Sequence, residues 1–218
     1  MMISLSDAGK RYNRDWIFRH FTYTFYTGNS YAIVGPNGSG KSTLLQAIGG
    51  AVGLSEGKIG VSRETAGVRL EASAALQSSE EGTENLYMQL AIVAPYLEVI
   101  EEMTVTEFLQ FHQTFKPLLP GLGIAQIIKA IGLEKAAEKQ IRFYSSGMKQ
   151  RVKLAQAIFS DAPLLLLDEP CTNLDSTGID LYQQLINTYC KDRLVIVSSN
   201  DEAEFGFCKE KINMLEYK

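Results

Sequence analysis

The stretch "IVGPNGSGKSTLL", residues 33–45, decides the fold. Residues 35–42 within it fit the pattern G-x-x-x-x-G-K-[ST]. The flanks fit as well, because "YAIV" at 31–34 has the composition of a short buried strand and residues 41–49 have helical spacing of apolar side chains. A strand, a glycine loop and a helix in this order predict a phosphate-binding loop.

Each residue type in the loop has a physical reason. Glycines let backbone N–H groups turn toward a phosphate without a Cβ clash, and the helix start adds its partial positive charge. We expect Lys41 to reach the β- and γ-phosphates and the Ser42 hydroxyl to ligate Mg²⁺. An ordinary glycine-rich turn is the alternative, and the flanking elements argue against it. The predicted nucleotide-binding residues are Gly35, Pro36, Asn37, Gly38, Ser39, Gly40, Lys41, Ser42 and Thr43.

Length and composition limit the classes of protein. The chain has 218 residues, of which 45% are hydrophobic, which is enough for one compact α/β domain. A net charge of −4 gives no global basic field, so no nucleic-acid partner is expected. The longest apolar runs, such as "APLLLL" at 162–167, are too short to span a membrane, and the N-terminus lacks the apolar core of a signal peptide. We therefore expect a cytoplasmic chain with reduced thiols at Cys171, Cys190 and Cys208.

Strands and helices alternate along the chain. β-Branched and aromatic residues predict strands at "MISL" and "WIFRHFTYTFYTG", which would form an N-terminal antiparallel β-subdomain. Further strands are predicted within "GKIGVSRE", "GVRLEA", "QLAIVA", "PLLLLDE", "RLVIVSS" and "KINMLEY", with "QSSEEGTEN" as a polar loop. Apolar strands that alternate with helices predict an α/β fold with a mainly parallel sheet covered on both faces.

Helical spacing dominates the middle of the chain. "TVTEFLQFHQTF" opens with Thr104 and has Glu107 three residues later, which is a capping-box pattern. "IAQIIKAIGL" and "SSGMKQRVKLAQAIF" are also helical by spacing, as are "STGIDLYQQLINTYCK" and the short "DEAEFGFC" nearer the end. We therefore predict one domain, 1–218, with a nucleotide-binding core at 1–96 and 161–218 and an inserted helical subdomain at about 97–160.

Two adjacent acids follow the most hydrophobic strand. Asp168 and Glu169 end the run "LLLLDE", and ligands of parallel sheets lie at the carboxyl ends of the strands. A parallel neighbour would bring both acids beside the glycine loop. Asp168 could then support Mg²⁺ while Glu169 orients or deprotonates an attacking water. The alternative is that both acids only cap the following turn.

These motifs together resemble the ATP-binding cassette (ABC) family, the nucleotide-binding subunits of ABC transporters. "GPNGSGKST" at 35–43 looks like the Walker A loop, and "LLLLDEP" at 164–170 looks like Walker B with the catalytic glutamate. "TNLD" at 172–175 resembles the D-loop, and "YSSGMKQR" at 144–151 lies where the signature LSGGQ-x-QR belongs. The resemblance covers nearly the whole chain and implies a P-loop NTPase core that binds ATP with Mg²⁺.

The resemblance also implies roles for residues outside these loops. Tyr12, 29 residues before Lys41, lies where the family places an aromatic that stacks on adenine, and Trp16 is a weaker candidate. In the family two subunits pair head to tail, and each signature helix points its N-terminus at the γ-phosphate held by the other. Ser145, Ser146 and Gly147 would supply those contacts. Sequence alone would otherwise make this triplet an N-cap.

Three positions depart from the family pattern. In the signature, Ser146 and Met148 replace a glycine and a glutamine. At the Q-loop, Pro95 or Tyr96 stands where a glutamine contacts Mg²⁺ and water, with Glu98, Glu101 and Glu102 as possible substitutes or as lining of a partner groove. Asn200 replaces the switch histidine; an amide can hydrogen-bond the γ-phosphate but carries no exchangeable charge.

The departures shape the expected function. Lys41, Glu169 and Asn200 are the implied catalytic positions, and losses elsewhere predict slow or partner-dependent hydrolysis. The resemblance implies a transporter ATPase that pairs with a second ABC subunit and docks a separate transmembrane permease near residues 95–115, on the inner face of the cell membrane. The competing hypotheses are a soluble ABC-type ATPase acting on ribosomes or nucleic acid, an ATP-gated clamp with little hydrolysis, and another P-loop enzyme such as a small-molecule kinase.

Overall fold

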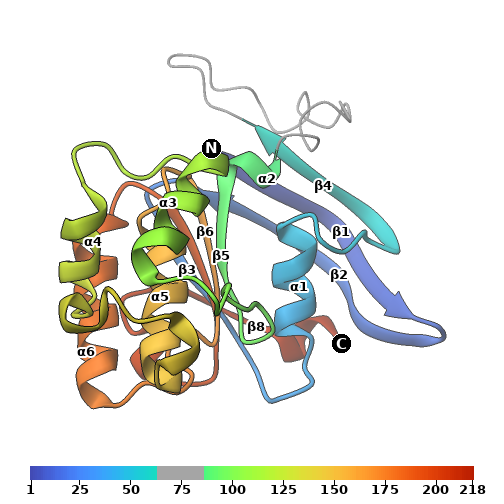
Figure 1. Cartoon of the computed structure of the whole chain (residues 1–218). Helices are drawn as coiled ribbons and strands as arrows, with labels where there is room; N and C mark the ends of the chain where they lie inside the picture. The colour runs from blue at the N-terminus through green and yellow to red at the C-terminus, as the bar shows by residue number, and fades with distance from the viewer. Residues whose placement is uncertain (63–85) are drawn as a thin grey trace.

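A computed structural model describes residues 1–62 and 86–218. A parallel sheet lies at the centre, with a group of helices on one side and with α1 (Lys41–Ile48) and an antiparallel sheet on the other (Figure 1). The strand expected within "GVRLEA" and the polar loop expected at 77–85 lie outside the described residues. So does the end of the strand expected within "GKIGVSRE".

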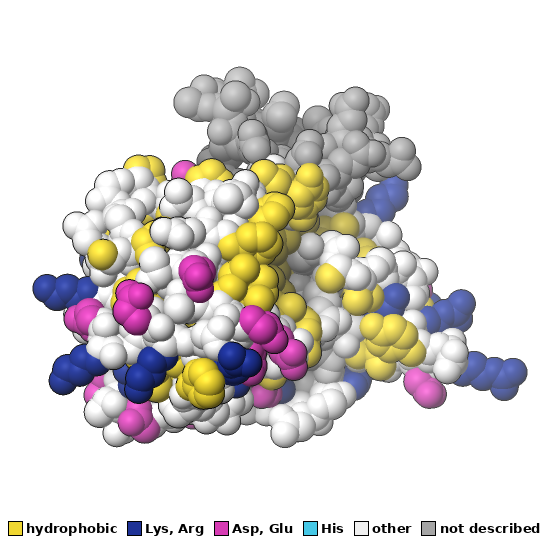
Figure 2. Space-filling model, in the orientation of Figure 1, with side chains coloured by type: hydrophobic (Ala, Val, Ile, Leu, Met, Phe, Trp, Pro, Cys, Tyr) yellow, Lys and Arg dark blue, Asp and Glu magenta, His cyan; other side chains and the backbone are white. Residues whose placement is uncertain are grey.

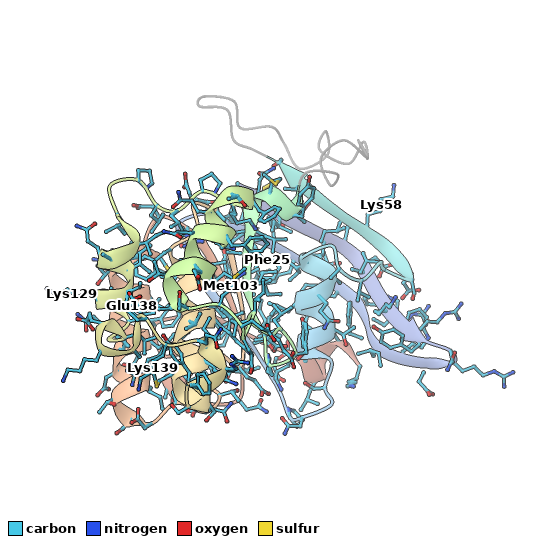
Figure 3. All side chains as sticks on the ribbon, in the orientation of Figure 1. Phe25, Lys58, Met103, Lys129, Glu138 and Lys139 are labelled. Carbon is cyan, nitrogen blue, oxygen red and sulfur yellow. The ribbon has the colours of Figure 1, made fainter. Side chains whose placement is uncertain are left out.

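The first sheet is antiparallel and comes from the N-terminal part of the chain. It contains β1 (Met2–Tyr12), β2 (Asp15–Tyr26) and β4 (Glu56–Ser62) in the order β2-β1-β4. Aromatic side chains from β2 fill its inner face: Phe25 is fully buried, whereas Lys58 projects from the outer edge on β4 (Figure 3). This is the expected antiparallel β-subdomain.

The second sheet is parallel and has five strands. Their order is β5-β6-β7-β3-β8, namely Leu90–Val93, Leu164–Asp168, Leu194–Ser198, Ser30–Val34 and Glu210–Asn213. Every residue of β6 and β7 is buried. Continuous burial of this kind requires cover on both faces, which explains why these strands are apolar without alternation.

Alternate side chains of this sheet enter two different cores. Leu164, Leu166 and Ile196 pack with α1 and the antiparallel sheet. Leu165 and Val197 pack with the helical side of the molecule. Because successive side chains of a strand point to opposite faces, one short apolar run binds both layers to the sheet.

The helices follow the predicted order. Besides α1 they are α2 (Leu86–Gln89), α3 (Val105–Phe115), α4 (Ile124–Ala130), α5 (Ser146–Ile158), α6 (Ser176–Tyr189) and α7 (Glu202–Phe205), with 3-10 turns at Glu134–Ala136, Ile141–Phe143 and Met214–Tyr217. The capping box of α3 is confirmed, because Thr104 Oγ1 accepts from the Glu107 N–H while the Glu107 carboxylate accepts from the Thr104 N–H. The α/β fold class is confirmed.

Two expectations about element ends are wrong. The last strand stops at Asn213, and residues 214–217 form a 3-10 turn in place of continued strand. The Asn213 side chain accepts from the Leu215 N–H at 3.1 Å, which offers the backbone a local bond that a strand ladder would otherwise supply. In addition, "LYMQ" at 86–89 forms the short helix α2, where the sequence indicated only the approach to a strand.

Candidate functional site

The glycine loop has a backbone that only glycine accepts at its key positions. Gly35, Gly38 and Gly40 have φ of 146°, 76° and 102°, in the region that L side chains rarely adopt. Close packing adds a second reason. A Cβ on Gly35 would lie 2.8 Å from Ser39 Oγ, and one on Gly40 would lie 2.8 Å from Ile17 Cγ2. The loop is therefore closed tightly on itself and on β2.

The loop encloses a buried cation and a buried hydroxyl. Lys41 Nζ donates to the carbonyl of Gly35 at 2.8 Å and lies 3.5 Å from that of Pro36. Burial lowers the Lys41 pKa, and the charges of Glu169 and Asp168 oppose that shift. Ser39 Oγ is buried without a hydrogen-bond partner among the residues described. A loop that contains a buried ammonium and an unsatisfied buried hydroxyl fits an acceptor-rich anion such as a phosphate.

Asp168 connects the parallel sheet to the glycine loop through two serine hydroxyls. The parallel register of β6 and β7 pairs Asp168 with Ser198. Asp168 Oδ1 accepts from Ser198 Oγ at 2.7 Å and from Ser42 Oγ at 3.1 Å. The carboxylate is buried, so it depends on these two donors.

The oxygens of Ser42 and Asp168 have the hard character that Mg²⁺ requires. Among residues 1–62 and 86–218, no group of three or more His, Cys, Asp or Glu side chains could hold a metal ion alone. Ser42 and Asp168 would hold a Mg²⁺ ion at this point, and the ion would supply positive charge next to a bound phosphate. The residues present fit that arrangement.

Glu169 lies next to this cluster in an unusual backbone conformation. Its φ is 45°, which is left-handed for a residue with a Cβ. The Glu169 N–H donates to the Ser198 carbonyl at 2.9 Å, so the bend occurs directly at the end of the parallel ladder. The side chain is exposed and its charge is felt by Lys41.

Asn200 follows β7 and reaches the glycine loop. Its Nδ2 donates to Asn37 Oδ1 at 3.0 Å. The structure therefore brings together Lys41, Ser42 and Asp168 with the loop, and places Asn200 at its rim.

Ser145, Ser146 and Gly147 lie elsewhere on the chain. Ser145 caps α5 by accepting from the Met148 N–H at 3.3 Å. The triplet lines a cavity of about 590 Å³ together with the segments at 132–136 and 173–175, and none of residues 35–42 lines it. Within one chain, the signature segment thus faces a cavity of its own.

The two aromatic candidates differ in their surroundings. Tyr12 ends β1 with an exposed ring, and the Lys10 ammonium lies 5.0 Å from the ring centroid. Trp16 has the guanidinium of Arg19 at 4.4 Å and that of Arg11 at 5.6 Å from its ring. Trp16 is thus already engaged by cations, whereas Tyr12 offers more free ring surface.

The three carboxylates considered as substitutes for the Q-loop glutamine differ in their surroundings. Glu101 forms an ion pair with Lys149 at 2.5 Å, which ties it to α5. The Glu102 carbonyl accepts from Gln140, and Glu98 is exposed. Pro95 and Tyr96 follow β5 directly and are exposed.

Two contributors to the site were missed by sequence reasoning. Ser198 donates to Asp168, and Glu204 binds the backbone just after Glu169. The signal for Ser198 was available, since it ends a buried strand as Asp168 does. Glu204 gave no signal, because it looked like one acid among several on a short exposed helix.

Comparison with known proteins agrees with this geometry. A sequence model of the ABC transporter family matches residues 18–172. The chain belongs to the ABC transporter family. An uncharacterized ABC transporter ATP-binding protein, YybJ of Bacillus subtilis, is 26% identical over 98% of this chain and 92% of its own length. The lantibiotic transport ATP-binding protein SrtF of Streptococcus pyogenes is 26% identical over 91% of this chain and 80% of its own.

A solved structure supports the fold assignment. The bacterial ABC transporter cassette MJ0796, solved as a dimer, superposes with a TM-score of 0.76 at 21% identity, covering 97% of this chain and 94% of that one. Like its relatives, this chain is an ABC ATP-binding subunit of the transporter type. No helix in the described part of the chain has the length and apolarity to cross a membrane.

Proposed function

We propose that this chain binds Mg-ATP at residues 35–43 and hydrolyses it to power a membrane transporter. The observation that carries the proposal is the cluster of Lys41, Ser42 and Asp168, in which Lys41 and Asp168 are buried and the Ser42 hydroxyl donates to Asp168. The same loop contains the buried, unpartnered hydroxyl of Ser39. Each group is of the type that a triphosphate and its cation need, and all lie at the carboxyl edge of a parallel sheet.

The residues divide the work by their chemistry. Lys41 and the loop N–H groups bind the phosphates, and Ser42 with Asp168 hold Mg²⁺, which when bound neutralises the charge that develops on the phosphoryl group. Glu169 accepts the proton of the attacking water. Asn200 donates a neutral hydrogen bond at the rim and moves no proton.

A second ABC subunit completes the site in this proposal. Ser145, Ser146 and Gly147 lie at the start of α5 and face away from their own glycine loop, so they are free to meet the nucleotide of another chain. The relative MJ0796 was solved as a dimer. With Met148, with Pro95 or Tyr96, and with Asn200 at the departing positions, turnover by the chain alone is slow and rises with the partner.

An apolar surface on α2 and α3 is the proposed permease contact. Figure 2 shows a band of hydrophobic side chains on this face of the molecule. Six large side chains there are exposed: Tyr87, Met88, Tyr96, Ile100, Phe111 and Phe115. Exposed apolar patches of this kind mark protein–protein contacts. Docking here would hold the chain at the inner face of the cell membrane.

Nucleotide binding is tested by calorimetry with Mg-ATP. Lys41→Met should weaken binding by about 10-fold or more, because a charge-assisted phosphate contact contributes at least 1.5 kcal/mol. Lys129→Met is the matched control, since Lys129 is an exposed lysine on α4, outside the loop. Equal affinities for native chain and Lys41→Met would refute the assignment of the loop.

The docking surface is tested by affinity capture from detergent-solubilised membranes. Phe115→Ser should reduce recovery of the transmembrane partner without changing Mg-ATP affinity. Tyr26→Ser is the control, because Tyr26 is also an exposed aromatic but lies on β2. Unchanged recovery with Phe115→Ser, or capture of ribosomes in place of a membrane protein, would contradict the transporter role.

A further inference from the structure

The backbone at Glu169 needs support from its surroundings. A non-glycine residue with a φ of 45° is strained, and such residues persist only where neighbouring contacts fix them. The first contacts are hydrogen bonds of the Glu169 backbone itself. The Glu169 N–H donates to the Ser198 carbonyl at 2.9 Å, and the Glu169 carbonyl accepts from Thr172 Oγ1 at 2.8 Å. The Thr172 N–H also donates to the Glu169 carbonyl at 3.2 Å, so these bonds close a turn over residues 169–172.

The chain after Glu169 is held by a buried carboxylate from α7. Glu204 is only 5% exposed, and its Oε1 accepts from the Cys171 N–H at 2.7 Å. The Ser199 hydroxyl also bonds this carboxylate, and the Glu204 carbonyl accepts from Tyr182 Oη at 2.8 Å. Glu204 is therefore fixed at both its side chain and its backbone, which makes it a rigid anchor.

A second buried amide supports the same turn. Gln150 of α5 is 4% exposed, and its Nε2 donates to the Pro170 carbonyl at 2.6 Å. The two backbone groups after Glu169 are thus satisfied from opposite sides, one by α5 and one by α7. A turn held in this way cannot relax the Glu169 dihedral without breaking a buried hydrogen bond.

We propose that Glu204 is a positioning residue that fixes the direction of the Glu169 side chain through its bond to Cys171. This inference rests on the proposed function, in which Glu169 accepts the proton of the attacking water. Glu204 also lies four residues after Asn200, on the helix that this segment enters.

The role needs an acceptor oxygen and not a charge. Burial raises the Glu204 pKa, and the bonds from Ser199 and Cys171 oppose that rise. The charges of Asp201 and Glu169 also face this carboxylate and raise its pKa further. A glutamine amide keeps an oxygen for the Cys171 N–H, whereas methionine fills the volume without an acceptor. Comparison of the two variants therefore distinguishes the effect of the hydrogen bond to Cys171 from the effect of side-chain volume.

The experiment compares Glu204→Met, Glu204→Gln and the matched control Glu202→Met in the full chain. Glu202 lies on the same helix but is exposed and pairs with Lys211. We expect Glu204→Met to lower kcat for Mg-ATP by about 10-fold or more, because small misplacements of a reacting group have effects of this size. Affinity for Mg-ATP should stay within about twofold, and Glu204→Gln should restore the native rate.

Several results would overturn the proposal. A native kcat in Glu204→Met would do so. An equal loss of Mg-ATP affinity and kcat in Glu204→Met, which Glu204→Gln does not restore, would also do so. If the native chain binds Mg-ATP without measurable turnover, the hydrolytic part of the proposed function fails instead. Hydrogen exchange of the 171–173 amides then tests, independently of turnover, whether Glu204 fixes the turn after Glu169. Faster exchange in Glu204→Met than in Glu204→Gln supports this role, and equal exchange refutes it.

Discussion

Ser198→Ala removes one of the two donors that satisfy the buried carboxylate of Asp168. The Ser198 hydroxyl lies 2.7 Å from Asp168 Oδ1, and after its removal only the Ser42 hydroxyl at 3.1 Å remains. Asp168 is 2% exposed, so water cannot replace the lost donor freely. Hydrogen bonds to charged groups contribute about 1.5–3 kcal/mol. We expect the free energy of unfolding to fall by that amount, which lowers Tm by about 3–12 °C for a chain of this size.

Chemical and thermal unfolding measure this change. Ser6→Ala is the matched control, because Ser6 is an exposed strand serine on β1. Saturating Mg-ATP should reduce the difference in unfolding free energy between Ser198→Ala and the native chain, since a bound cation gives Asp168 another partner. A loss below about 0.5 kcal/mol in Ser198→Ala, or an equal loss in Ser6→Ala, would refute the reasoning.

Three further predictions follow from the loop and its surroundings. Gly35→Ala should weaken Mg-ATP binding by about 10-fold or more, because its Cβ would meet Ser39 Oγ at 2.8 Å; Gly28→Ala, with nothing within 4 Å, should bind normally in the same titration. Asn200→His should raise turnover and introduce a pH dependence near 6.5, and an unchanged pH–rate profile would contradict the role given to this position. Burial and the neighbouring Lys116 charge lower the His112 pKa below 6.5, so the unfolded chain binds that proton more tightly. The His112 contribution to the free energy of unfolding should therefore be fully present above about pH 7 and be lost as the pH falls through 6.5 toward the lower pKa of the folded chain. Denaturant titrations above pH 7 and below pH 6.5 should show a smaller loss of unfolding free energy in His112→Gln than in the native chain.

The sequence predicted the parts of the fold that depend on local pattern. The glycine loop, the apolar runs of β6 and β7 and the capping box at Thr104 each follow from neighbouring residues. β1 was predicted only over its first residues. Its register against β2 and β4 shifts at several points, and these irregularities remove the alternation that identifies a strand.

The site residues that lie at the end of a strand or within the glycine loop could be predicted from the sequence. Asp168 and Ser42 could be paired in advance, because carboxyl ends of parallel strands gather at one edge. The contacts of Glu204 with Cys171 and of Gln150 with Pro170 could not be predicted. Each joins separate elements through a side chain whose local pattern is that of an ordinary helix. Long-range polar contacts of this kind depend on the packed core rather than on sequence spacing.

Mg-ATP hydrolysis by the purified chain at high concentration, beside Glu169→Gln, tests the central claim most directly. We predict slow release of phosphate by the native chain, none by Glu169→Gln, and equal Mg-ATP affinity for both. Equal turnover in the two proteins would remove Glu169 from the mechanism. Loss of Mg-ATP binding in Glu169→Gln would instead make this residue part of the binding site, and would contradict the division of work between the glycine loop and the carboxylate that follows β6.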